Sequence, residues 1–197
     1  KALNVSNSVI NKLIRDKVLL IKNVDDYKIK NNKSEKSIKL NVSQRNAVKS
    51  ILDDSLENQG NTFLLDGVTG SGKTEAVVET GRRLYHTLAS EGFELKLYHV
   101  NSANINTKAF GDSEQRLKEV FRDAKALDDP SQRTILLFDD IDSLLLKRDD
   151  VNAKEWTMSL NGVFFHELDA LNTTKTMVVA TTNLPDRLDP AVRSRLA

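Results

Sequence analysis

A short glycine-rich segment carries the residue types that bind phosphate groups. Residues 67–74 fit the spacing Gly-x4-Gly-Lys-Ser/Thr of a phosphate-binding loop. Glycines let the backbone wrap around phosphate oxygens with its N–H groups inward, and a helix that follows presents its positive end to the same anion. Lys73 is expected to reach the β- and γ-phosphates of ATP, and the Thr74 hydroxyl to bind Mg²⁺. The residues expected to contact the nucleotide are Gly67, Val68, Thr69, Gly70, Ser71, Gly72, Lys73, Thr74 and Glu75.

A pair of carboxylates follows a second apolar run farther along the chain. Residues 134–138 have the composition of a strand buried on both faces, and Asp139 and Asp140 come directly after them. Because open parallel sheets bind ligands at the carboxyl ends of their strands, we expect both side chains at the edge where the phosphates lie. Asp139 is predicted to bind Mg²⁺, directly or through water. Asp140 is predicted to orient and deprotonate the attacking water, so the pattern indicates ATP hydrolysis.

Alternating strand and helix patterns predict the elements that position these residues. The runs expected to be strands are residues 62–66, 95–100, 134–138 and 176–180. The first helix is expected to begin at Ser43, as its N-cap, and to end near residue 58. Further helices are expected over residues 73–90, 114–127 and 156–171. Strands separated by helices imply an α/β fold, with a parallel sheet between two helical layers.

Length and composition are those of a globular chain. With 197 residues, 39% hydrophobic and 29% charged, the sequence suits one α/β domain, or one domain with an N-terminal extension. We predict an extension and linker over residues 1–40 and the nucleotide-binding domain over residues 41–197. No run of about 18 apolar residues and no signal-peptide pattern is found, so we expect no membrane partner and a cytoplasmic or nuclear location. The absence of cysteine excludes disulfides and thiolate metal sites.

Positive charge is concentrated at the start of the chain. Residues 1–40 carry ten Lys and Arg against four Asp and Glu, although the formal net charge of the whole chain is only +1. A basic segment of this kind is able to contact nucleic acid or an acidic partner. A solvated, lysine-rich extension explains the same charges, since no aromatic or arginine cluster accompanies the lysines. Both interpretations stay open at this point.

Several segments, in order and with the right spacing, resemble the AAA+ superfamily, and within it the AAA group of protein-remodelling ATPases. The segments are residues 108–114 (first pore loop), 137–144 (Walker B), 164–169 (after the second pore loop) and 180–191 (sensor 1 strand and its exit). The resemblance covers roughly Thr62 to the end. It implies the large subdomain of a P-loop NTPase, ATP with Mg²⁺ as cofactors, other AAA+ subunits as partners in a hexameric ring or arc, and a protein client.

The resemblance also implies roles for individual residues. Asn183 corresponds to sensor 1, which positions water against the γ-phosphate. Arg193 and Arg195 stand where the family carries arginine fingers, which act on the ATP of the neighbouring subunit, and Arg195 is the stronger choice. Together with Lys73 and Asp140 they form the predicted catalytic set.

The sequence departs from the family pattern at several positions. Asp140 stands where the family nearly always has Glu, and a carboxylate one methylene shorter predicts slow hydrolysis or a subunit that mainly binds ATP. Ala109 replaces the usual pore-loop aromatic, so Phe110 is as well suited to packing as to gripping a client. The phosphate loop reads Gly-Val-Thr-Gly-Ser-Gly where the family usually has Gly-Pro-Pro-Gly-Thr-Gly. The chain ends at Ala197, before the expected fifth strand and helical lid.

Three alternative interpretations remain. Residues 63–75 are similar to the phosphate loop of primosomal replication-restart helicases, and residues 40–44 to the adenine-reading glutamine segment of superfamily-2 helicases. The acidic sequence of residues 139–142 argues against such a helicase. A replication-initiator ATPase that works as an ATP switch would suit Asp140 and the basic extension. A degenerate AAA+ module that only binds nucleotide is the third alternative, and Lys73 and Asn183 argue against it.

Overall fold

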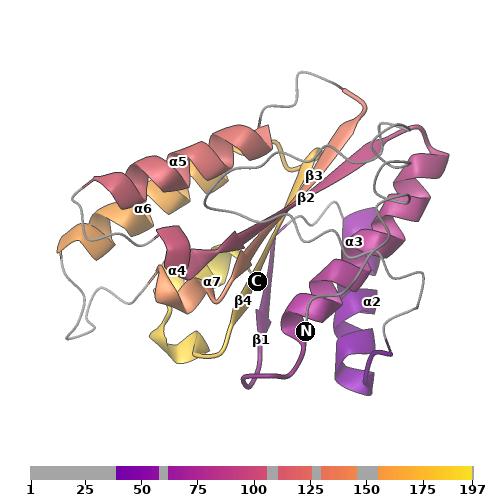
Figure 1. Ribbon diagram of the computed structural model, residues 1–197, viewed down its shortest axis with the longest axis horizontal. Coiled ribbons are helices and arrows are strands. Elements are labelled where there is room, and N and C mark those ends of the chain that lie inside the picture. The colour runs from indigo at the N-terminus through magenta and orange to yellow at the C-terminus, as the bar shows by residue number, and fades with distance from the viewer. Residues whose placement is uncertain (1–38, 58–61, 106–110, 126–129, 146–154, 197) are drawn as a thin grey trace, which may run out of the picture.

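The computed structural model describes residues 39–57, 62–105, 111–125, 130–145 and 155–196. Its centre is a four-stranded parallel sheet with the strand order β1-β4-β3-β2. The strands are β1 (Thr62–Asp66), β2 (Glu94–Asn101), β3 (Gln132–Asp139) and β4 (Thr176–Thr182), as Figure 1 shows. Since β4 lies between β1 and β3, the ends of three strands that carry predicted site residues are direct neighbours.

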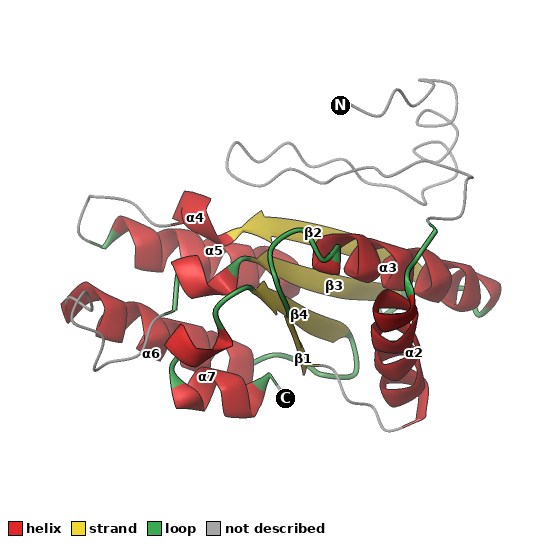
Figure 2. Ribbon diagram, turned by 90° about the horizontal axis from the view of Figure 1, so that it is seen from below, coloured by secondary structure: helices red, strands yellow, loops and turns green. Residues whose placement is uncertain are grey.

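Helices cover both faces of the sheet. α2 (Val42–Glu57) and α3 (Lys73–Ser90) lie on one side, and α5 (Asp112–Lys125) and α6 (Glu155–Asp169) on the other, so that Figure 2 shows three layers. The short helical segments are α4 (Ser102–Ile105), η1 (Ile141–Ser143), η2 (Pro185–Arg187) and α7 (Pro190–Arg195). The predicted three-layer α/β fold with a parallel sheet is therefore confirmed.

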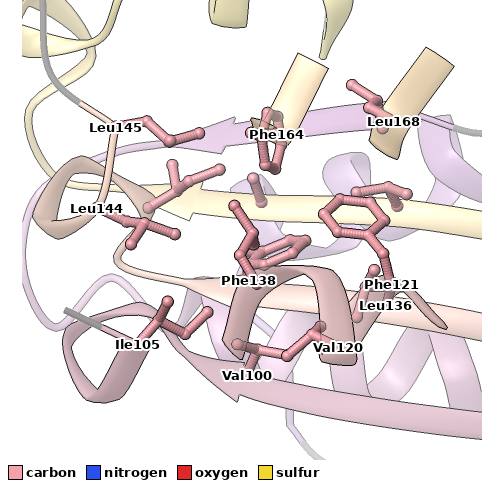
Figure 3. Close-up of a cluster of buried hydrophobic side chains, with 14 of the residues drawn as sticks. Val100, Ile105, Val120, Phe121, Leu136, Phe138, Leu144, Leu145, Phe164 and Leu168 are labelled. Carbon is pink, nitrogen blue, oxygen red and sulfur yellow. The ribbon is translucent and has the colours of Figure 1, made fainter. Parts of the chain in front are cut away.

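The hydrophobic core has one part on each face of the sheet. Successive residues of β3 alternate between them, with Leu136 and Phe138 in the larger cluster and Ile135 and Leu137 in the cluster against α3. Phe138 packs against Phe121 and Phe164, with ring centroids 5.6 and 5.5 Å away (Figure 3). This alternation explains why β3 reads as a continuous apolar run, and it fixes the strand whose end carries Asp139.

The observed elements differ from the predicted ones mainly at their ends. β4 continues two residues farther than predicted, to Thr182, and α5 begins at Asp112. The prediction that Ser43 caps the first helix is wrong, because α2 begins at Val42 and Ser43 is an exposed residue within it. The side chain of Asn41 accepts a hydrogen bond from the Gln44 backbone N–H at 2.9 Å and so takes the capping position.

Some sequence predictions fall on residues outside the described ranges. These are the apolar pattern and the linker within residues 1–38, and the first three residues of the pore-loop segment, residues 108–110. The proposed boundary between an extension and a domain at residues 40 and 41 stays a prediction. Within the described parts of the chain, no helix combines the length and the apolar character needed to span a membrane.

Candidate nucleotide-binding site

The phosphate loop joins the end of β1 to the start of α3. Gly70 and Gly72 both have a φ of +77°, in the left-handed region that favours glycine. Gly72 is also the N-cap of α3 and provides no side chain to bind the first N–H groups of the helix. The Val68 side chain is 76% exposed, so the outer turn of the loop is open to solvent. This geometry leaves the positive end of an 18-residue helix facing an accessible turn.

Lys73 holds its ammonium group over the loop. Its Nζ atom donates to the backbone oxygens of Gly67 at 2.9 Å and Val68 at 3.2 Å. It also donates to Asn183 Oδ1 at 2.8 Å, across 110 residues of sequence. The predicted sensor 1 residue, which follows β4, therefore lies directly beside the phosphate-loop lysine.

Thr74 and Asp139 meet between α3 and β3. Thr74 Oγ1 donates to Asp139 Oδ1 at 2.8 Å, and Thr181 Oγ1 donates to the same oxygen at 2.7 Å. The other carboxylate oxygen, Oδ2, lies 3.1 Å from His99 Nε2. Burial works to raise the pKa of Asp139, but the hydrogen bonds from His99, Thr181 and Thr74 outweigh it and lower the pKa to about 2. Asp139 is therefore ionised at neutral pH.

Asp140 occupies an unusual backbone conformation. Its φ of 52° and ψ of 55° are left-handed, and among the described residues no other non-glycine residue has a positive φ. Its backbone N–H donates to Thr181 Oγ1 at 3.1 Å, and its Oδ1 accepts from Asn183 Nδ2 at 2.9 Å. Burial and the charges of Asp139 and Asp142 raise the pKa of Asp140 above its usual value. A carboxylate with a raised pKa is a better proton acceptor.

Asn183 is held by both its side chain and its backbone. Its amide oxygen accepts from Lys73 and its amide nitrogen donates to Asp140, so the side chain links the phosphate loop to the end of β3. Its backbone N–H donates to Asp142 Oδ1 at 3.2 Å, and the Thr182 hydroxyl donates to the same oxygen. Asp142 thus ties the ends of β3 and β4 together and orients Asn183.

The two predicted arginine fingers lie elsewhere. The Arg195 Nε atom donates to Asp169 Oδ1 at 3.2 Å, and its guanidinium carbon lies 4.7 Å from the centre of the Phe165 ring. Arg193 lies 3.7 Å from a carboxylate oxygen of Asp186. Both are exposed residues of α7 and contact their own chain, whereas Lys73, Thr74, Asp139, Asp140 and Asn183 converge.

Sequence reasoning missed residues that shape the site without a motif of their own. They are His99, which contacts Asp139, Thr181, which contacts Asp139 and Asp140, and Asp142, which contacts Asn183. The available signal was a polar residue near the carboxyl end of a buried strand. His99 and Thr181 are such residues, and both are buried here. Their contacts depend on strand register, which the sequence alone did not define.

The oxygen donors of the site fit Mg²⁺. Among the described residues, no group of three or more His, Cys, Asp or Glu side chains is arranged to hold a metal ion. Mg²⁺ does not need such a cage, because it is usually bound by one or two carboxylates, water and the phosphates of its substrate. The Thr74 hydroxyl and the ionised Asp139 carboxylate, which are 2.8 Å apart, are donors of this kind.

Most of the chain resembles proteins of known family. A family model described as "ATPase family associated with various cellular activities (AAA)" matches residues 63–197. Fidgetin-like protein 1 of Drosophila melanogaster is 33% identical over 135 residues, which are 67% of this chain and 23% of that protein. Spastin of Ixodes scapularis is 33% identical over 136 residues, 68% of this chain and 19% of that protein. A Cell division cycle protein 48 homolog of Archaeoglobus fulgidus is 33% identical over 115 residues, 58% of this chain and 15% of that protein.

A solved structure has the same fold. A chain of the HORMA:CdnC:Trip13 complex of E. coli MS115-1 superposes with a TM-score of 0.60 at 24% identity, covering 75% of this chain and 49% of that one. The chain spans less than a quarter of the length of each of the three relatives named above. The family model, however, covers well over half of the chain and includes the phosphate loop, the carboxyl ends of β3 and β4, and α7. This chain therefore belongs to the AAA family of ATPases.

Proposed function

We propose that this domain binds ATP with Mg²⁺ and hydrolyses it, and that the full-length protein uses this cycle to remodel a protein client. The proposal depends on one observation. Lys73 and Thr74 of the phosphate loop contact Asn183 and Asp139, which follow or end two neighbouring strands, so that all four polar groups share one small region. The similarity to proteins such as fidgetin-like protein 1 and spastin supports an ATPase activity of the AAA type. Action on a protein client is inferred by analogy with the family.

Each polar group has a proposed task. Lys73 binds the β- and γ-phosphates, and the backbone N–H groups of the loop bind the remaining phosphate oxygens. Thr74 and Asp139 would hold Mg²⁺, which when bound neutralises charge that develops on the phosphate oxygens. Asp140 accepts a proton from the attacking water, while Asn183, hydrogen-bonded to Asp140 at 2.9 Å, orients that water. The short Asp140 side chain reaches less far than a Glu would, so we expect slow turnover.

The deciding experiment measures ATP turnover of the full-length protein with Mg²⁺, alone, with an unfolded polypeptide and with duplex or single-stranded DNA. Turnover stimulated by the polypeptide is the expected result. Stimulation by DNA alone would replace the remodelling role with that of a replication initiator or helicase. No turnover, together with tight ATP binding, would replace hydrolysis with a purely structural use of the nucleotide.

Substitution of Asp139 by asparagine is expected to weaken the coupling between Mg²⁺ and ATP. The carboxylate accepts three side-chain hydrogen bonds and is ionised, and an amide of the same shape removes its charge. In the presence of EDTA the variant should bind ATP about as well as the unmodified protein. The gain in ATP affinity on addition of Mg²⁺ should be smaller than in the unmodified protein by a factor of roughly ten or more. Equal Mg²⁺ titrations for both proteins would argue against Asp139 as a ligand.

Substitution of Arg195 by alanine is expected to lower turnover without loss of ATP binding. We propose that Arg195 leaves Asp169 and Phe165 and acts on the site of a neighbouring subunit in a ring or arc. Loss of such a finger costs roughly a thousandfold in rate. Mixing this variant with Lys73→Ala subunits should restore part of the activity, since intact sites then meet intact fingers. A mixture as inactive as its parts would contradict action in trans, and Arg193→Ala should have the smaller effect.

A further inference from the structure

The start of α2 lies against the phosphate loop. Gln44, in the first turn of α2, directs its side-chain amide nitrogen at two carbonyl oxygens of the loop. Gln44 Nε2 donates to Ser71 O at 3.0 Å and to Gly72 O at 3.2 Å, across 27 and 28 residues of sequence. Residues 40–44 precede the segment that the family model matches, which begins at residue 63. The loop is therefore contacted by a side chain outside the shared family domain.

The Gln44 side chain is fixed from its other end as well. Its Oε1 atom accepts the backbone N–H of Asn41 at 2.8 Å, while the Gln44 backbone N–H donates to Asn41 Oδ1 at 2.9 Å. This reciprocal pair is a capping box, which satisfies two backbone donors at the start of the helix. The amide plane of Gln44 is thereby oriented so that its two N–H bonds face the loop.

α2 itself is anchored to the body of the domain. Leu40, Val48 and Ala76 form a small buried cluster that includes the first turn of α3, and Leu52 and Leu65 pack against it. Contact between helix and loop is also close. A Cβ atom at Gly72 would lie only 2.0 Å from Gln44 Nε2, so this position has no room for a side chain while Gln44 stays in place. Gln44 thus belongs to a helix that is packed against the domain, and its side chain contacts the loop directly.

The two carbonyls that Gln44 binds belong to peptide groups with a second function. A trans peptide is planar, and its C=O and N–H bonds point in opposite directions. The carbonyls of Ser71 and Gly72 share their planes with the N–H groups of Gly72 and Lys73. Gln44 holds both carbonyls on its own side, and the Ala76 N–H, which also donates to Gly72 O at 3.1 Å, supports the second of them. Both N–H groups must therefore point away from Gln44. These N–H groups lie in the part of the loop that is expected to bind phosphate.

We propose that Gln44 is a positioning residue of the nucleotide site, which fixes the orientation of two phosphate-binding N–H groups and so strengthens binding of the di- or triphosphate whatever the base. The proposal rests on the proposed nucleotide binding by the loop. This role differs from that of the adenine-reading glutamine of helicases. Both N–H bonds of the Gln44 amide are directed at the loop, so neither is directed at a base.

The experiment compares variants of the full chain in their binding of ADP, GDP and inorganic pyrophosphate, each measured by displacement of a fluorescent ADP analogue in Mg²⁺. Gln44→Met keeps the size of the side chain and removes both donors. It should weaken all three ligands by a similar factor of roughly ten, as expected for two lost hydrogen bonds. Gln44→Glu, which turns a carboxylate toward two carbonyl oxygens, should weaken them further.

Two matched controls separate this role from simple helix stability. Asn41→Ala removes one bond of the capping box, from the Gln44 backbone N–H to Asn41 Oδ1, and keeps the bond from the residue 41 backbone N–H that orients the Gln44 amide. It should lower the melting temperature yet bind all three ligands within about twofold of the unmodified protein. Gln115→Met replaces an exposed glutamine of α5, which bonds to Glu119, and should change neither property. Melting curves show whether each variant is folded. If only one of the two Gln44 variants is folded, its ligand binding is enough to test the proposal.

Three results would overturn the proposal. One is unchanged binding by a folded Gln44 variant. Another is equal weakening by Asn41→Ala, which would assign the effect to α2 stability. The third is weakening of ADP alone, which would make Gln44 a reader of the base. Failure of the proposed function gives a different pattern, in which Lys73→Ala binds the three ligands as well as the unmodified protein does.

Discussion

Replacement of Lys73 by alanine is expected to abolish nucleotide binding or turnover. The ammonium group is the positive charge at the centre of the site, and it donates to Gly67 O, Val68 O and Asn183 Oδ1 at 2.8–3.2 Å. The substitution therefore removes a charge-assisted contact to phosphate and leaves Asn183 without one of its two side-chain partners. We expect turnover to fall by at least roughly a hundredfold, as when a main charge-stabilising donor is removed from an active site.

The measurement is ATP affinity by calorimetry together with phosphate release. Lys118→Ala, in which an exposed lysine of α5 is removed, is a control with the same chemical change away from the site and should behave as the unmodified protein. Unchanged affinity and turnover in the Lys73 variant would remove the phosphate-loop assignment, and with it the proposed function.

Replacement of Asp140 by asparagine is expected to stop hydrolysis and leave ATP binding intact. Asparagine has the same shape and tolerates the left-handed backbone that Asp140 adopts, with φ of 52°, so the loop should keep its conformation. What changes is the proton acceptor, because an amide oxygen is not basic. Loss of a general base typically costs a factor of about 10² to 10⁴. Single-turnover hydrolysis with ATP in excess over its dissociation constant is the appropriate assay.

Two further variants sharpen this prediction. Asp140→Glu should preserve or raise the rate, since the longer side chain brings the carboxylate closer to the water that a family enzyme activates. Asp186→Asn changes a side chain that is 96% exposed and should leave the rate unchanged. An Asp140→Asn protein that turns over normally would show that another group takes the proton.

Interactions between distant segments define much of the site. Thr181 reaches Asp139 because β3 and β4 pair in one register, with Phe138 opposite Ala180. A shift by one residue would send the neighbouring side chain to this position. The Arg195 contact with Asp169 depends in the same way on how α7 packs near the end of α6, and no pattern in either segment predicts it.

The sequence by itself determined the elements of the fold and the ends of the strands at which chemistry occurs. Glycine spacing specifies a phosphate loop because only glycine adopts its backbone freely, and the apolar period distinguishes strands from helices over a few residues. These are local properties. The convergence of Lys73, Asp139 and Asn183 was predictable in outline, because parallel strands place their carboxyl ends at one edge.

Only the tertiary structure decided which side chains actually touch at that edge. The bond from Lys73 to Asn183 spans 110 residues, and the bonds from Gln44 to the loop span 27 and 28. Such contacts depend on strand register, on helix placement and on the rotamer of each side chain together. Register, helix placement and rotamers depend on packing across the whole domain, so a local pattern in the sequence does not predict them.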